Sequence, residues 1–433
     1  MLAALALVVA GCGDTSSTGS GDTRRVLVDY RGDEFSASYL AYFPTDVKVH
    51  PGDSVEFKQY WTGEPHSVTM GTLVEDLGRP FWEILDRVRS GERIDFSEEE
   101  EPDSPEFFEQ LPFLADEDLN PVQAAAQPCY LDEGGPDFSD PDEPCPQRDQ
   151  PAFNGRQSYY NSGFIPYKGA AGNTFRLPIA DDATPGTYHY YCNWHFVVMS
   201  GSVTIVPEGE PIPSQSEVNE AARRELDRYS TALGRVLDET RRGKRYELPV
   251  IGASLTQEES DEQGLIEGIV NEFIPSTVNA KVGEKVTWTF DGGHSLAFNV
   301  PKYFPVFDVE DDGRVTLDKR GFNAVRFPGG PSESEEGEGD DGSDGGHAED
   351  GAEDGAGGES GESGGADEEA GDDDGGRESV HVDGGRFDGR GGLHSTGMGF
   401  GDGDTYSLTF TRPGTYPFAC LIHPAMVGKV VVK

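Results

Sequence analysis

One segment of this chain occurs twice, and it limits the possible folds more than any other feature. The two copies lie within Pro185–Val206 and Arg412–Lys433. Each has Pro-Gly-Thr-Tyr, a cysteine four residues after the tyrosine, a histidine three residues after the cysteine, and a final Met-x-Gly-x-Val. The cysteine, histidine and methionine are Cys192, His195 and Met199 in the first copy, and Cys420, His423 and Met426 in the second. Such self-similarity indicates two units built on one plan.

The residues around the second cysteine predict a loop between two strands. Pro413-Gly414 is typical of a turn, and the alternating, β-branched run Val427–Lys433 predicts a returning strand. A loop between antiparallel strands holds its side chains close together. Thiolate, imidazole and thioether suit copper that cycles between Cu(I) and Cu(II), with two histidines and one cysteine in a plane and a weak axial methionine. The loop supplies one histidine, so the second must come from upstream.

The Cys-x2-His-x2-Met spacing of Cys420, His423 and Met426 resembles the cupredoxin (blue copper) family, and amicyanin in particular. The resemblance implies an all-β protein with two tandem amicyanin/plastocyanin-like domains. Each would be a Greek-key β-sandwich with one type 1 copper. We expect a helical linker between the sandwiches, a partly helical insertion in the first and a disordered acidic insertion in the second.

The upstream ligands follow from the same resemblance. In cupredoxins the first histidine ligand comes after a hairpin and before a short apolar strand. His66 follows two runs of alternating apolar and polar residues around Pro51-Gly52, and His294 follows two similar runs around Gly283. The implied copper ligands are His66, Cys192, His195 and axial Met199 in the first site, and His294, Cys420, His423 and axial Met426 in the second.

The first copy departs from the family pattern. Three residues, not two, separate His195 from Met199, and Phe196 stands where the second copy has Pro424. Axial ligation by Met199 therefore requires a loop that bulges by one residue.

The resemblance also implies how electrons enter and leave. His195 and His423 would each lie near an apolar surface and pass the electron. We expect the docking patches to contain Trp194 and Phe196 at one site, and Leu421, Pro424 and Ala425 at the other.

Changes in composition along the chain predict its organisation. We expect a lipoprotein signal and tether at 1–23, a first cupredoxin domain at 24–208 with an insertion at about 71–157, a helical linker at 209–246, and a second cupredoxin domain at 247–433 with an insertion at about 331–377. The linker begins with a capping-box pattern at Ser214–Glu217, and apolar residues then recur every three or four positions until Gly243. The second insertion is acidic and has almost no apolar residues, so it cannot offset its ordering entropy.

All five cysteines have a predicted role. Cys12 follows the apolar run Leu2–Val9 and resembles the lipidated cysteine of a bacterial lipoprotein signal, although the basic residues expected before such a run are absent. An ordinary cleaved signal is the alternative, and the run is too short to span a membrane. Cys129 and Cys145 flank a loop rich in proline and aspartate, and we expect them to form a disulfide in an oxidising compartment. These features predict an extracytoplasmic, lipid-anchored protein, in the periplasm or at the cell surface.

The charge of the chain limits its partners. It carries 80 acidic and 34 basic side chains, for a net charge of -46. This balance argues against nucleic-acid binding, which requires basic patches. It is typical of salt-adapted proteins, in which high ionic strength screens self-repulsion. An acidic surface also favours a basic redox partner such as a c-type cytochrome, although salt weakens this attraction.

The histidines argue against a copper enzyme. Multicopper oxidases and copper nitrite reductases, also built from cupredoxin units, need further copper held by histidines, typically in His-x-His pairs and beside the type 1 cysteine. No His-x-His occurs in the chain, and no histidine flanks Cys192 or Cys420. The remaining histidines are interpreted as surface residues, with His347 a weak metal signal: His50, His189, His347, His381 and His394. The sequence therefore predicts an electron carrier; copper storage or delivery is the alternative, and an oxidase or reductase is less favoured.

Overall fold

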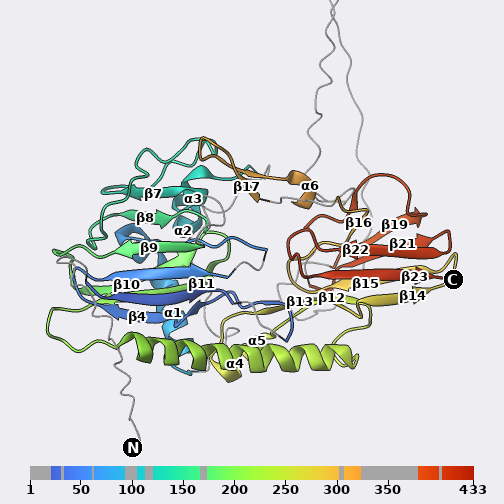
Figure 1. Cartoon of the computed structure of the whole chain (residues 1–433), viewed down its shortest axis with the longest axis horizontal. Coiled ribbons are helices and arrows are strands. Elements are labelled where there is room, and N and C mark those ends of the chain that lie inside the picture. Colours follow the sequence, from blue (N-terminus) through green and yellow to red (C-terminus); the bar gives the residue numbers. More distant parts are fainter. Residues whose placement is uncertain are drawn as a thin grey trace, which may run out of the picture.

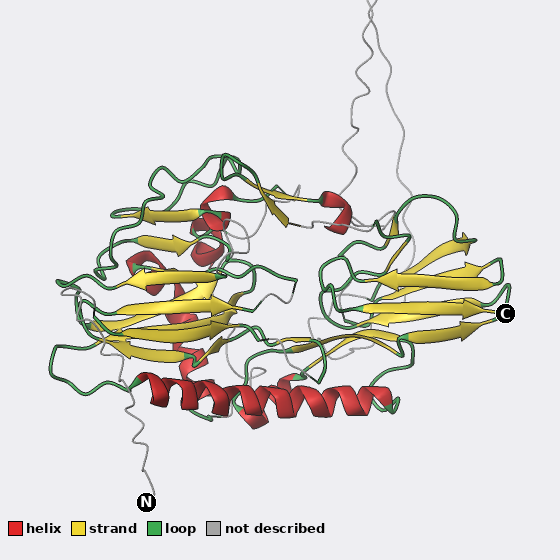
Figure 2. Cartoon of the chain, in the orientation of Figure 1, coloured by secondary structure: helices red, strands yellow, loops and turns green. Residues whose placement is uncertain are grey.

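The computed structural model describes residues 21–30, 34–60, 63–92, 105–112, 120–165, 173–301, 307–322, 379–398 and 402–433. Two β-sandwich units lie side by side, and one long helix runs along both (Figure 1). The expected all-β class is confirmed, because the described structure is mostly β-sheet with few helices (Figure 2). Cys12, the tether, His347 and the predicted acidic insertion at about 331–377 lie outside the described residues. The domain boundaries stay a prediction.

The first unit consists of two packed sheets. Its strands are β1 (Thr23–Val28), β3 (Tyr42–Phe43), β4 (Asp46–Val49), β5 (Ser54–Gln59), β6 (Thr69–Met70), β7 (Pro128–Leu131), β8 (Tyr159–Ser162), β9 (Thr174–Pro178), β10 (Gly186–Cys192) and β11 (Phe196–Ile205). One sheet has the order β3-β1-β5-β9, and the other has the order β4-β11-β10-β6-β8-β7. Along β4, Val47 and Val49 are buried while Asp46 and Lys48 are exposed, as the period of two in a half-buried strand requires.

The second unit repeats this plan. Its strands are β12 (Val250–Ser254), β13 (Ile269–Ile274), β14 (Thr277–Ala280), β15 (Lys285–Phe290), β16 (Ala297–Phe298), β19 (His381–Phe387), β20 (His394–Ser395), β21 (Thr405–Phe410), β22 (Gly414–Ala419) and β23 (Val427–Val432). The repeated segments form matching antiparallel hairpins, β10–β11 and β22–β23. Each hairpin is extended by a parallel strand, β4 beside β11 and β14 beside β23. The sequence repeat is therefore a structural repeat.

The insertion of the first unit is partly helical, as expected. It contains α1 (Thr72–Arg89), α2 (Pro105–Gln110) and α3 (Gln123–Ala126). Helix α1 begins at Thr72 and includes Pro80. Helix α1 covers β10, where Trp82 stacks on His189 with ring centroids 5.0 Å apart. His189 is thus packed beneath a helix and is not a surface residue. Cys129 and Cys145 form a disulfide within the same insertion.

Two exchanged segments interlock the units. Strand β2 (Ala37–Ser38), from the N-terminal part of the chain, pairs with β13 at the edge of a sheet of the second unit. That sheet has the order β19-β21-β15-β12-β13-β2, and the sheet facing it has the order β14-β23-β22-β16-β20. In the other direction, the hairpin of β17 (Phe307–Val309) and β18 (Val315–Leu317) packs on Phe164 and Trp194 of the first unit. The side chain of Gln123 bonds both the N–H and the carbonyl group of Val315. Each unit therefore holds a piece of the other.

Helix α4 (Gln215–Arg241) also holds the two units together. It begins at Ser214, which forms the expected capping box with Glu217. Its buried face, including Leu233 and Val236, shares one core with Phe43 of the first unit and with Val250 and Val270 of the second. The short helices α5 (Gln257–Gln263) and α6 (Lys319–Phe322) complete the fold. Within the described residues, no helix combines the length and the apolar character needed to cross a membrane.

Candidate metal centres

The first candidate centre lies at the end of the β10–β11 hairpin. Cys192 is the last residue of β10, and the N–H group of His195 donates to its carbonyl oxygen at 3.1 Å, which closes a tight loop. His66 arrives from the segment before β6, where it forms a bridge with Ile165. Although 126 positions separate His66 from Cys192, their side chains meet in the buried end of the sandwich. Met199 is also fully buried, and it belongs to the same hydrophobic core cluster as Cys192.

The three donor atoms of this centre form a compact triangle. His66 Nδ1 lies 3.2 Å from His195 Nδ1, and Cys192 Sγ lies 3.8 Å and 3.7 Å from these two atoms. A point equidistant from all three would lie about 2.1 Å from each, which is within the range of metal bonds to imidazole and thiolate. Two imidazoles and one thiolate are also the in-plane donor set of type 1 copper. The residues therefore fit a single copper ion.

The second candidate centre has the same design. His294 precedes β16, Cys420 follows β22, and their donor atoms lie with that of His423 within 4.8 Å of one another. His423 Nδ1 is 3.1 Å from His294 Nδ1 and 3.6 Å from Cys420 Sγ. The N–H group of Cys420 donates to the carbonyl oxygen of Met426 at 3.1 Å, and Met426 is buried in the same cluster as the cysteine. The structure thus brings each predicted His-Cys-His set together.

Each cysteine sulfur also accepts a hydrogen bond from a serine that the sequence reasoning did not single out. The N–H group of Ser67 donates to Cys192 Sγ at 3.4 Å, and that of Ser295 donates to Cys420 Sγ at 3.5 Å. The Ser295 hydroxyl accepts from the N–H group of Leu421 at 2.9 Å, so it ties the histidine segment to the cysteine loop. Such bonds to a ligand sulfur tune a metal's reduction potential. The signal was present in the sequence, because a serine follows the upstream histidine in both units.

Electrostatics prepare both cysteines to bind a metal. Burial opposes ionisation of Cys192, but hydrogen bonds with His195 and His66 outweigh it and hold the pKa of the thiol well below its usual value. Burial likewise opposes ionisation of Cys420, whose pKa is held low by His294 and His423. Thiolate is the form of cysteine that binds metals, so the lowered pKa of each thiol favours metal binding by these two residues.

The second ring nitrogens of the upstream histidines have different surroundings in the two centres. His66 Nε2 lies 3.4 Å from Asp29 Oδ2, and both side chains are fully buried. Asp29 is itself held in place because its Oδ1 accepts from the N–H groups of Tyr30 and Tyr39. Neither His66 Nε2 nor His294 Nε2 forms a hydrogen bond within the described residues, and there no ion pair joins His294 to a carboxylate. A carboxylate therefore supports a ligand imidazole on this side of the first centre.

This difference predicts unequal reduction potentials. A negative charge beside a ligand favours Cu(II) over Cu(I), so Asp29→Asn is expected to raise the potential of the first centre. We expect a rise of roughly 50–100 mV, equivalent to about 1–2 kcal/mol for one electron. Spectroelectrochemistry in a Cys420→Ser background reads this centre alone, with Asp182→Asn, an exposed aspartate of the same unit, as the control. An unchanged or lowered potential would contradict the assigned role of Asp29.

The loop histidines are not placed as the resemblance implied. His423 is buried and His195 is nearly so, and their Nε2 atoms face one carboxylate, that of Glu64. Trp194 packs against Phe164 and Phe307 beneath the β17–β18 hairpin. Leu421 is buried as well. Neither Leu421 nor Trp194 is exposed, whereas Pro424 and Ala425 are, so a docking patch at the second centre stays a prediction for those two residues.

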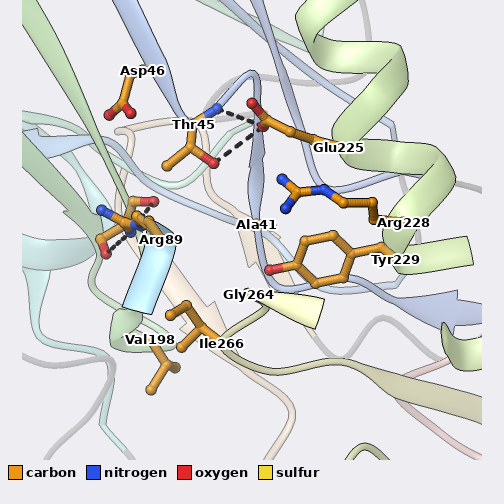
Figure 3. Close-up of a pocket in the computed structure, with 11 residues that line it drawn as sticks. Ala41, Thr45, Asp46, Arg89, Val198, Glu225, Arg228, Tyr229, Gly264 and Ile266 are labelled. Atoms are coloured by element: carbon orange, nitrogen blue, oxygen red, sulfur yellow. Dashed lines mark hydrogen bonds between the residues drawn. The ribbon is translucent and has the colours of Figure 1, made fainter. Parts of the chain in front are cut away.

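A polar pocket of about 100 Å³ lies elsewhere, between α1, α4 and β11 (Figure 3). Glu225 accepts from the N–H group of Thr45 at 2.8 Å and from its hydroxyl at 3.2 Å, and Arg89 donates to the Ser200 hydroxyl at 2.7 Å. No candidate ligand lines this pocket, so it is separate from both centres.

Comparison with known proteins agrees with the second centre. Residues 385–433, which include Cys420, His423 and Met426, match the family model of copper-binding proteins of the plastocyanin/azurin family. The expected resemblance to the cupredoxins is confirmed. This match includes neither the first unit nor His294, and the copper ligands of both units stay predictions. No curated protein matches the chain.

Solved structures of cupredoxins are also similar to parts of the chain. A Cu(I) amicyanin variant is 16% identical, covering 37% of this chain and 73% of its own, with a TM-score of 0.16. Reduced auracyanin from the photosynthetic bacterium Roseiflexus castenholzii is 16% identical, covering 44% of this chain and 100% of its own, with a TM-score of 0.21. At such values these structures add nothing to the account of the function.

Proposed function

We propose that this chain is an extracytoplasmic blue copper protein that transfers electrons between redox partners, with one type 1 copper in each unit. The observation that carries the proposal is the pair of buried His-Cys-His triads, each with all three donor atoms within 4.8 Å. His66, Cys192 and His195 would hold one copper, and His294, Cys420 and His423 the other. We propose Met199 and Met426 as the axial ligands, since each is buried in the core cluster of its cysteine.

The protein supports electron transfer through rigidity. Copper supplies the one-electron couple, and the chain holds the ligands in place while the charge changes. The cysteine loops are closed by backbone hydrogen bonds, and the upstream histidines are buried at 0% exposure. Ligands that are fixed before the metal binds need little rearrangement when its valence changes. A large rearrangement of the ligands would slow electron transfer, so ligands held in this way suit a carrier.

Location and partners are proposed on separate grounds. The disulfide between Cys129 and Cys145 suits an oxidising compartment. The proposed lipid anchor at Cys12 rests on the sequence alone. The net charge of -46 favours a basic partner, such as a c-type cytochrome, by electrostatic steering.

Copper loading tests the function directly. We expect about two coppers per chain by metal analysis and an intense visible thiolate-to-copper absorption that a reductant bleaches reversibly. Two coppers without that absorption would favour storage or delivery instead. One copper per chain would leave a single unit with an electron-transfer role, and turnover of oxygen or nitrite would favour an enzyme.

A further inference from the structure

The two loop histidines share one carboxylate. His423 Nε2 lies 3.2 Å from Glu64 Oε1, and His195 Nε2 lies 3.7 Å from Glu64 Oε2. The Glu64 side chain is 8% exposed, so water screens these contacts little. The same residue therefore contacts a candidate ligand of each centre, one with each of its oxygen atoms.

The backbone beside Glu64 is shaped for this position. Gly63 has a φ of 121°, and a β-carbon there would overlap the carbonyl oxygen of Ile422 and crowd the Pro424 ring. Only glycine allows the chain to approach the second copper loop this closely. Glu64 is consequently held against a loop that belongs to the other unit.

Further hydrogen bonds from both units hold Glu64. The side chain of Gln59 donates to the backbone carbonyl oxygen of Glu64 at 2.7 Å, and the Ser38 hydroxyl donates to Glu64 Oε2 at 3.1 Å. Asn271, from the second unit, donates to that hydroxyl at 2.8 Å. Because Ser38 lies on β2, the strand exchanged into the second sheet, the interlock itself positions the carboxylate.

The chemistry of a metal-bound histidine makes this arrangement specific. When Nδ1 binds a metal, the neutral ring keeps its proton on Nε2 and donates it to an outer acceptor, commonly a carboxylate. A carboxylate has two oxygens and no donor, so it can accept from both rings at once. An amide has one oxygen and a donating NH₂ group, so it cannot offer a separate acceptor atom to each ring.

We propose that Glu64 joins the two copper centres into one electron-transfer unit, with the route running from the His195 ring through the carboxylate to the His423 ring. The proposal rests on the function proposed above. With copper bound in both sites, one electron would pass along it, so that the donor copper would lose one electron and the acceptor copper would gain it. No bond is formed or broken, and both protons stay on their rings. The two centres then act as a relay and not as two independent carriers.

Rapid one-electron reduction of the fully oxidised protein tests this. Partial reduction by a radiolytic pulse, followed by optical detection and rapid-freeze EPR, should show redistribution of the electron between the centres at a rate independent of protein concentration. Glu64→Gln should slow this phase by at least ~10-fold, the lower end of losses found when an outer partner of a metal ligand is removed. In Cys192→Ser and Cys420→Ser, which each leave one centre, the phase should be absent.

A neighbouring carboxylate supplies the matched control. Glu267 interacts electrostatically with His195 and Glu64, but no ion pair joins it to His195 or His423 in the described part of the chain. Glu267→Gln makes the same carboxylate-to-amide change in the same region and should leave the rate unchanged. Thermal unfolding of both variants checks that they remain folded. A purely structural role for Glu64 would lower the unfolding temperature without slowing redistribution.

The outcomes separate this proposal from the function on which it rests. If the wild-type protein fails to bind two blue coppers, the proposed function is wrong. If two blue coppers bind and redistribution is absent, or equally fast in wild type and Glu64→Gln, only the relay is wrong. An equal slowing in Glu267→Gln would also overturn it, because general electrostatics would then account for the effect.

Discussion

Replacing Cys420 with serine is expected to remove one of the two blue centres completely. The cysteine sulfur is the soft, charged ligand of the set, and hydrogen bonds with His294 and His423 hold the pKa of the thiol well below its usual value despite its burial. A serine hydroxyl at this buried position stays protonated and lacks the sulfur orbital that gives the visible absorption. Bound copper should fall from about two to about one per chain, with the second centre's absorption lost. Metal analysis and visible spectroscopy measure both effects.

The chain offers two controls for this experiment. Cys192→Ser should remove the other centre, and the two residual spectra should add up to that of the wild type. Replacing both disulfide cysteines, Cys129 and Cys145, with serine changes the sulfur content but leaves both triads intact. This double variant should keep both absorptions. Retention of the full visible band in Cys420→Ser would contradict the ligand assignment for the second unit.

The sequence predicted the centres because most of their geometry is local. A cysteine, a histidine and a methionine on one hairpin loop are brought together by the turn and the strands alone. Cys420 and His423 could therefore be assigned from their spacing, and the repeat extended the assignment to Cys192 and His195. The upstream histidines were harder to assign from the sequence, because His66 comes close to Cys192 only once the whole sandwich has folded. Their position after a hairpin, known from the resemblance, supplied the missing information.

The relation between the units could not be predicted in this way. Glu64 lies in a short polar segment with no periodic pattern, and its contacts with His195 and His423 depend on how two separate sandwiches pack. Strand β2 is only two residues long, so no alternation marks it as part of the second sheet. Contacts between residues far apart in sequence leave no local pattern to read. For this reason the resemblance implied loop histidines near apolar surfaces, whereas in the structure both face Glu64.

The helix between the units was predicted, but its importance to the centres follows only from the structure. Leu233 of α4 is fully buried in the core that the helix shares with both sandwiches. Leu233→Ala is expected to destabilise the protein by about 2–5 kcal/mol, because it removes apolar contacts and leaves a cavity. The loss should appear as a lower midpoint of guanidinium denaturation, followed by circular dichroism at fixed salt concentration. Since this core sets the distance between the units, redistribution of electrons between the centres should also slow.

An exposed position of the same helix distinguishes loss of packing from loss of helix. Glu220 is exposed on α4, so Glu220→Ala should change the free energy of unfolding by no more than about 0.5 kcal/mol. Copper content should stay near two in both variants, because neither residue belongs to a triad. A Leu233→Ala protein as stable as Glu220→Ala would show that the units do not depend on this core. If it were less stable but redistributed electrons at the wild-type rate, α4 would stabilise the fold without setting the spacing of the centres.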